Sequence, residues 1–245
     1  KEVIEKKELE KIDKFTPKSS FIYPQKKPAI YKASTEEVEK SSVLNQKDFT
    51  RAKETIKFIK DKKWNSALKS ASKVKDREFR NLITWMYLKT TRNGASFSEY
   101  KNFIEQNNNY PRINRIRFLA ESKIYLRNNS PTSIINWFDK YPPLGGMGKI
   151  KLAEAYLEKG QADKVGELIK EGWETATISK NDLGYYRAKF KKFIDSEDHI
   201  KRADYLAWEK KYWDLKRMLK YLPKDQRALY NACLLYTSDA ADDLV

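Results

Sequence analysis

A helical period in the apolar residues, beginning near Asp48 and continuing for most of the chain, constrains the fold most strongly. Apolar residues recur every three or four positions, the spacing that places side chains on one face of an α-helix. No segment shows the sustained alternation of a strand, so we predict an all-α fold with no sheet. The predicted faces are Phe49, Ala52, Ile56 and Ile59; Trp64, Ala67, Leu68 and Ala71; Phe79, Leu82, Ile83 and Met86; Ile113, Ile116, Ala120 and Ile124; Ile150, Ala153 and Leu157; Ala162, Val165 and Ile169; Leu183, Tyr186, Phe190 and Phe193; and Leu215, Met218 and Leu222.

Helix-end residues agree with these faces. Ser130 offers an N-cap and is followed by Pro131, which suits the first helical position. Gly160 stands where a left-handed residue ends a helix. Ser179 with Asp182 resembles a capping box.

The predicted helices come in pairs. Every second helix is expected to start near residue 48, 77, 112, 146, 180 or 211, a spacing of roughly 30–35 residues that is typical of helical-hairpin repeats. A single hairpin cannot bury its apolar stripe, so neighbours must stack. We therefore predict a divergent α-superhelix, or solenoid.

Three parts of the chain differ in character. Residues 1–45 carry charge runs with Pro17, Pro24 and Pro28, and we expect a flexible or extended lead-in. Residues 46–232 form the predicted α-superhelical domain. Residues 233–245 contain three Asp and no Lys in a chain that is otherwise rich in Lys, and we expect a non-native tail. Residues 233–243 (CLLYTSDAADD) look like a translated sequencing adapter.

The net charge of +16 is compatible with several anionic partners. Lys is spread over nearly every segment, so solvated helix faces explain most of the charge. Nucleic-acid readers usually carry a clustered patch and a recognisable motif, and neither is present, so we expect no nucleic-acid partner.

The composition also limits metal and membrane chemistry. One Cys and one His exclude a disulfide within the chain and a metal site built from thiolates or several histidines, so we expect no metal and no cofactor. No apolar run is long enough to span a membrane. The chain begins at Lys1 without a visible signal peptide, which is expected of a processed form or a fragment.

Four stretches, in this order, resemble the superhelical domain of soluble lytic murein transglycosylases. They are residues 64–68 (WNSAL) with 82–85 (LITW); residues 103–104 (FI), 110–113 (YPRI) and 117–121 (RFLAE); residues 142–143 (PP) leading into 151–156 (KLAEAY); and residues 198–208 (DHIKRADYLAW).

The resemblance implies a U-shaped or ring-like helical domain in the periplasm whose partner is peptidoglycan. In that family a separate catalytic domain cleaves the bond between N-acetylmuramic acid and N-acetylglucosamine and leaves a 1,6-anhydro product. Its catalytic Glu should follow residue 232, so we expect this chain to end before it and to be inactive alone.

Two fragments imitate catalytic motifs. Glu121 is followed by Ser122, as in the family's catalytic Glu-Ser pair, but no Gly-Leu-Met-Gln stretch follows. We therefore expect Glu121 to stay ionised on a solvated helix face. Residues 144–149 (LGGMGK) lack the glycine spacing and the Ser or Thr of a phosphate loop, and we expect a loop between helices.

Neither His199 nor the six Trp residues suggests an active site. No nucleophile is indicated beside His199, so we interpret it as a structural hydrogen-bonding group. The helical spacing of the Trp residues favours packing for most of them. We therefore predict no catalytic, cofactor-binding or metal-binding residue in this chain.

Two alternative functions remain at this point. One is a tetratricopeptide-like adaptor, because residues 152–160 with 162–173 resemble one such unit. The other is a basic RNA-binding helical repeat. Oligomeric state and glycan preference do not follow from the sequence.

Overall fold

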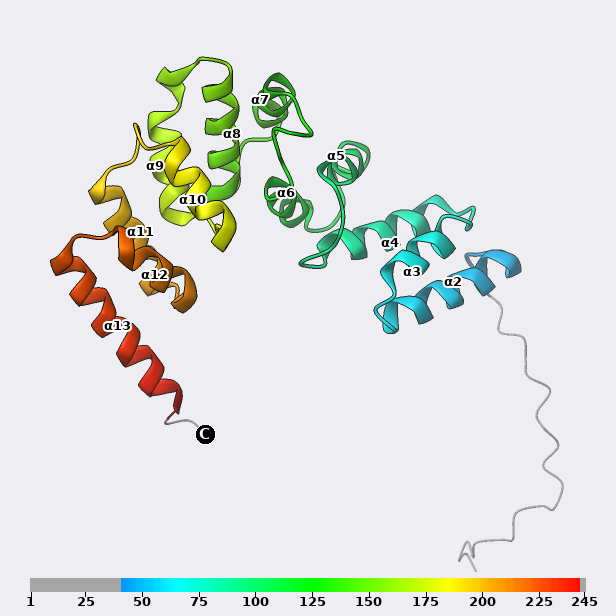
Figure 1. Ribbon diagram of the computed structural model, residues 1–245. Helices are drawn as coiled ribbons and strands as arrows, with labels where there is room; N and C mark the ends of the chain where they lie inside the picture. The colour runs from blue at the N-terminus through cyan, green and yellow to red at the C-terminus, as the bar shows by residue number, and fades with distance from the viewer. Residues whose placement is uncertain (1–40, 243–245) are drawn as a thin grey trace, which may run out of the picture. The chain divides into compact units, whose positions relative to one another are not determined.

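The computed structural model describes residues 41–242, with side chains described for residues 41–235. Over this part the chain forms twelve α-helices and two short 3₁₀ turns, and no strand, so the predicted all-α class is confirmed (Figure 1). The helices are α2 (Gln46–Lys60), α3 (Trp64–Ala71), α4 (Arg77–Lys89), α5 (Phe97–Gln106), α6 (Ile113–Glu121), α7 (Pro131–Lys140), α8 (Gly146–Glu158), α9 (Gly166–Thr175), α10 (Lys180–Lys189), α11 (Ser196–Trp208), α12 (Tyr212–Met218) and α13 (Lys224–Asp242), with 3₁₀ turns at Ala162–Lys164 and Leu219–Tyr221.

The even-numbered helices match the predicted repeat. They begin at residues 46, 77, 113, 146, 180 and 212, each within two residues of its predicted start. Helices pack mainly against the next helix in the chain or the one after it, as α8 does against α9 and α6. Such near-neighbour packing is what helical repeats require. The stacked solenoid itself stays a prediction.

The chain falls into two units, residues 1–42 and 43–245. The predicted lead-in lies mostly outside the described residues, and the first described helix begins at Gln46. The helix α13 runs through residue 233, where the predicted tail begins, and Leu234 is buried against the core. The non-native origin of that tail stays a prediction.

Two apolar cores lie in the second unit, and α8 contributes to both. Ile150 and Ala153 belong to the core formed with α9 to α13. Leu152 and Ala155 belong to the core formed with α4 to α7. These pairs lie on different sides of α8. The apolar residues of this helix are therefore not confined to a single face.

Three predicted core positions are wrong. Ile56 and Leu82 are partly exposed, and Ala162 is exposed. In α2 the buried side instead carries Asp48, Ala52 and Thr55. Asp48 turns inward because it accepts hydrogen bonds from Lys75 N at 3.1 Å and from the Asn45 side chain.

The predicted helix ends are largely confirmed. Ser130 accepts a hydrogen bond from Ser133 N, with Pro131 at the first position of α7. Gly160 has φ +73° after α8. Ser179 Oγ accepts a hydrogen bond from Asp182 N, and the Asp182 carboxylate accepts one from the Ser179 hydroxyl rather than from the Ser179 backbone N–H of a full capping box. Among the described residues no helix is long and apolar enough to cross a membrane.

Candidate functional site

A polar side of α8 lies between its two apolar sides. Lys151, Glu154 and Glu158 follow one another at intervals of three and four residues, so they share one helix face. Lys151 and Glu154 are both buried, which is unusual for charged residues. This face therefore needs partners from other elements.

Glu154 is satisfied by residues of α10. The Tyr185 hydroxyl donates to Glu154 Oε1 at 2.5 Å, and Lys189 Nζ donates to the same oxygen at 3.1 Å. Lys189 also bonds Glu158 at 2.8 Å. Burial alone would lower the pKa of Lys189, but its bonds to Glu158, Tyr185 and Glu154 raise it above the ordinary value. These bonds fasten α10 to α8.

Lys151 is held differently. The residue is 4% exposed. Its Nζ lies 4.4 Å from the centre of the Tyr125 ring and 5.3 Å from the centre of the Tyr186 ring. Burial lowers its pKa, while Glu154 and Asp182 act in the opposite direction. Two aromatic faces thus stabilise the cation of a largely buried side chain.

Lys151 faces a hollow of about 440 Å³, here called the tyrosine–lysine pocket. Residues from the segment after α6, from α8 and from α10 line it, so three separate parts of the chain converge. Its lining combines aromatic faces with both signs of charge and consists of Tyr125, Leu126, Arg127, Lys151, Glu154, Asp182, Tyr185 and Tyr186.

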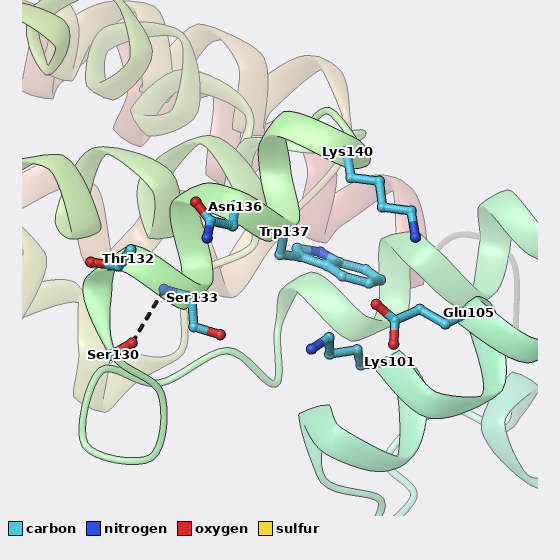
Figure 2. Close-up of a pocket in the computed structure, with 8 residues that line it drawn as sticks. All are labelled: Lys101, Glu105, Ser130, Thr132, Ser133, Asn136, Trp137 and Lys140. Carbon is cyan, nitrogen blue, oxygen red and sulfur yellow. Dashed lines mark hydrogen bonds between the residues drawn. The ribbon is translucent and has the colours of Figure 1, made fainter.

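A second hollow of about 390 Å³ lies between α5 and α7. Figure 2 shows Lys140 and Glu105 on either side of the Trp137 indole, with Lys101 and Glu105 supplied by the neighbouring helix. Trp137 is almost fully buried because it packs edge-on against Phe97 and lies 4.4 Å from Tyr141. The other residues that line this α5–α7 hollow are polar, and they include Ser130, Thr132, Ser133 and Asn136.

Glu121 departs from its expected environment. It is 3% exposed rather than solvated, and its carboxylate accepts from Leu144 N at 2.5 Å and Gly145 N at 3.0 Å. Burial raises its pKa to about 7, although the backbone bonds from residues 144, 145 and 148 and the nearby Arg117 pull the other way. The expectation of a solvated Glu121 is wrong because its partners come from a distant part of the chain, at and just before the start of α8.

Residues 146–149 are also helical rather than a loop, because α8 begins at Gly146. The N-terminus of a helix offers free N–H groups to an acceptor, and the Glu121 side-chain oxygens supply that acceptor from within the chain. A Cβ at Gly148 would lie only 2.5 Å from Glu121 Cδ, so glycine permits the close approach. Glu121 therefore joins α6 to the start of α8.

His199 and Arg202 hold α11 against α9. His199 Nδ1 accepts a hydrogen bond from Trp173 Nε1 at 3.2 Å, and burial lowers the pKa of His199. Arg202 is fully buried, donates to the Trp173 carbonyl and lies over the Trp173 ring. Burial lowers its pKa to about 10. These contacts place His199 in the structural position that we predicted.

The six Trp side chains divide into two groups. Trp64, Trp85, Trp137 and Trp173 are buried or half-buried, as predicted for most of them. Trp208 and Trp213 are 86% and 67% exposed, at the end of α11 and the start of α12. Over the described residues, no three or more His, Cys, Asp or Glu side chains gather closely enough to hold a metal ion.

Sequence reasoning did not find the tyrosine–lysine pocket. The sequence did carry a signal for it. Lys151 and Glu154 interrupt a helix that is rich in Ala and Leu and has apolar residues on two sides. The Tyr residues that complete the pocket come from distant parts of the chain, and only folding brings them together. No family model, curated protein or solved structure matches this chain.

Proposed function

We propose that this chain is the superhelical part of a peptidoglycan lytic transglycosylase that acts on the periplasmic cell wall, and that its helical body binds the wall polymer. The four resembling stretches, in the family's order, carry the proposal. All four fall largely on packed helices, and the residues of the fourth, including His199 and Arg202, make the buried contacts between α9 and α11. An all-α fold agrees with that resemblance.

Two exposed indoles support binding to a glycan. Trp side chains are highly buried on average, and these two are mostly exposed. Trp208 and Trp213 offer flat apolar faces on which sugar rings stack, and Lys216 Nζ lies 5.5 Å from the Trp213 ring centre. A cation beside an aromatic face suits a glycan that carries carboxylates. The net charge of +16 acts in the same direction.

Co-sedimentation of the purified 245-residue chain with peptidoglycan sacculi tests the proposal. We expect the protein to sediment with intact sacculi and to remain in solution after the sacculi are digested. Replacing both Trp208 and Trp213 by Ala should lower the bound fraction, whereas Leu229→Ala, another exposed apolar position, should not. Failure of the wild-type chain to bind sacculi would reject the proposal.

The same samples report on catalysis. We expect no 1,6-anhydro muropeptides to be released from sacculi by this chain alone. Release that persists in Glu121→Gln would mean that the chain holds an active site elsewhere.

The α8–α9 hairpin favours a second candidate, the tetratricopeptide-like adaptor. A Cβ at Gly172 of α9 would lie 3.0 Å from the Gly146 carbonyl oxygen, so the two helices approach closely at small residues. Such close hairpins are typical of that repeat class. An adaptor would bind peptides but not sacculi, so the sedimentation result separates the two candidates.

A further inference from the structure

The Lys151 side chain is largely buried, and it lines the tyrosine–lysine pocket without a protein acceptor for its ammonium group. No residue within 41–235 accepts a hydrogen bond from its Nζ, although the residue is 4% exposed. A buried charge is costly unless it is paired and hydrogen-bonded, and the cation–π contacts with Tyr125 and Tyr186 offset only part of that cost. The ammonium group therefore offers N–H donors to a ligand in the tyrosine–lysine pocket.

The nearest carboxylate is already engaged elsewhere. Glu154 Oε1 accepts hydrogen bonds from both Tyr185 and Lys189, and Lys189 is bonded in turn to Glu158. Asp182 accepts from the Ser179 hydroxyl at 2.7 Å. These bonds leave Lys151 without a bonded oxygen of its own in the described residues, although two carboxylates lie nearby.

A second cation lines the same hollow. The Arg127 guanidinium lies 5.1 Å from the Tyr125 ring centre, so Tyr125 contacts both Arg127 and Lys151. Lys and Arg together recognise a carboxylate through charge-assisted hydrogen bonds. The exposed Tyr185 adds an aromatic face, and a hollow of about 440 Å³ is within the range of small-ligand sites.

We propose that the tyrosine–lysine pocket binds a small ligand by its carboxylate, which accepts hydrogen bonds from Lys151 and Arg127 while the body of the ligand lies along Tyr125 and Tyr185. The pocket has room for one sugar acid or one dipeptide. The source of the carboxylate rests on the proposed function, whereas the binding site itself does not. Under that function the carboxylate belongs to peptidoglycan, in which muramic acid or the stem peptide carries it.

Two pairs of probes distinguish the two sources. N-acetylmuramic acid differs from N-acetylglucosamine by its lactyl carboxylate, and L-alanyl-D-glutamate differs from its fully amidated form by its carboxylates. Calorimetric titration of the full chain should show binding of at least one acid and no binding of its neutral counterpart. Equal binding of the acid and the neutral compound, or no binding of either acid, overturns the proposal.

Substitution of Lys151 locates the binding. We expect Lys151→Met to weaken binding of the acid by roughly tenfold or more, because a charge-assisted hydrogen bond is lost. Lys140→Met, which removes a cation from the α5–α7 hollow, should leave the affinity unchanged. Unchanged affinity in Lys151→Met, or an equal loss in Lys140→Met, contradicts the site.

A surface variant guards against a folding defect. Arg127 is exposed, so Arg127→Gln should fold as the wild type does, with the same helical circular dichroism, and still weaken binding of the acid. An unchanged affinity in this variant would also count against the proposal.

Sacculus binding separates this proposal from the proposed function. If the chain binds the acid probes but not sacculi, the pocket stands and the wall-binding function fails. If it binds sacculi but neither acid, the wall-binding function stands and the pocket proposal fails.

Discussion

At the scale of single residues, Glu121 shows how a buried carboxyl group can join one helix to the start of another. Its oxygens accept hydrogen bonds from the N–H groups of Leu144 and of Gly145, the N-cap residue of α8. Its elevated pKa of about 7 follows chiefly from burial. The proton on Glu121 is therefore linked to the stability of the contact between α6 and α8.

The sign of this linkage gives a first prediction. The folded chain holds the Glu121 proton more tightly than the unfolded chain, so its contribution to stability is complete below pH 4.5 and is lost as the pH rises to about 7. The loss is on the order of 3 kcal/mol, at 1.36 kcal/mol per pKa unit. Urea unfolding of the wild type and of Glu121→Gln at several pH values measures it as the difference between the two proteins.

The stability of the wild type relative to Glu121→Gln should therefore fall from pH 4.5 to 7. His199 acts in the opposite sense, because its lowered pKa makes stability fall below pH 6.5. Both proteins carry His199, so its effect cancels. A difference that is constant with pH would show that Glu121 does not titrate in this range.

Lys62 and Lys210 are single residues in an unfavourable backbone conformation. They have φ +59° and +54° after α2 and α11, as Gly160 has after α8. In each case the next residue's N–H closes the helix end, for example from Lys63 N to the Phe58 carbonyl and from Lys211 N to the Leu206 carbonyl. Two lysines thus occupy positions that favour glycine.

We predict that Lys62→Gly and Lys210→Gly each stabilise the protein by roughly 0.5–1 kcal/mol, because relief of the left-handed strain exceeds the added chain entropy. Thermal unfolding followed by circular dichroism measures the change. Lys57→Gly, inside α2, is the matched control and should destabilise by about 1 kcal/mol. Destabilisation at residues 62 and 210 as well would show that the strain is not present.

At the scale of elements, α8 is the helix on which neighbouring parts of the chain converge. Its N-terminus binds Glu121, two of its sides enter separate apolar cores, and a third carries Lys151 and Glu154. Substitutions in α8 should therefore cost more than similar changes in exposed helices.

Two glycine substitutions test this expectation. Gly148→Ala should destabilise by about 2–4 kcal/mol, because the new methyl group would overlap the Glu121 carboxylate and displace it from the helix N-terminus. Gly184→Ala in α10 has no neighbour within 4 Å and should stabilise by roughly 0.5–1 kcal/mol through helix propensity. Urea denaturation measures both. A similar response at the two positions would mean that Glu121 can move away without cost.

Local patterns predicted the elements well, and long-range partners account for most of what they missed. Periodicity and caps placed the even-numbered helices because both depend on residues a few positions apart. Glu121 and its helix partners are more than twenty residues apart, so its sequence neighbourhood resembled a solvated face. Lys62 was missed because its neighbours, not its own side chain, determine its backbone angles.

At the scale of the whole molecule, near-neighbour packing and the net charge of +16 have separate consequences. Packing between successive helices lets each part form mainly from local contacts. The charge attracts anionic polymers from a distance, but salt screens it within about 8–10 Å at physiological ionic strength. Under the two proposals above, specific recognition would therefore depend on individual side chains such as Trp208 and Lys151.

The position of α8 in both cores makes a prediction for unfolding. Chains built from near-neighbour contacts often melt in separate stages, one stretch of helices before another. Here neither core can unfold while the other stays intact, because unfolding of α8 would remove buried residues from both cores. We expect α4 to α13 to unfold in one transition, with coincident curves from Trp fluorescence and circular dichroism.

Ala153→Ser and Ala155→Ser would probe the two sides of α8 independently. Each variant should lower the midpoint without splitting the transition, and a separate early transition in either would contradict the prediction. The helix α8 would then act as the element that makes the protein cooperative, converting a row of locally packed helices into a unit that is either folded throughout or not folded at all.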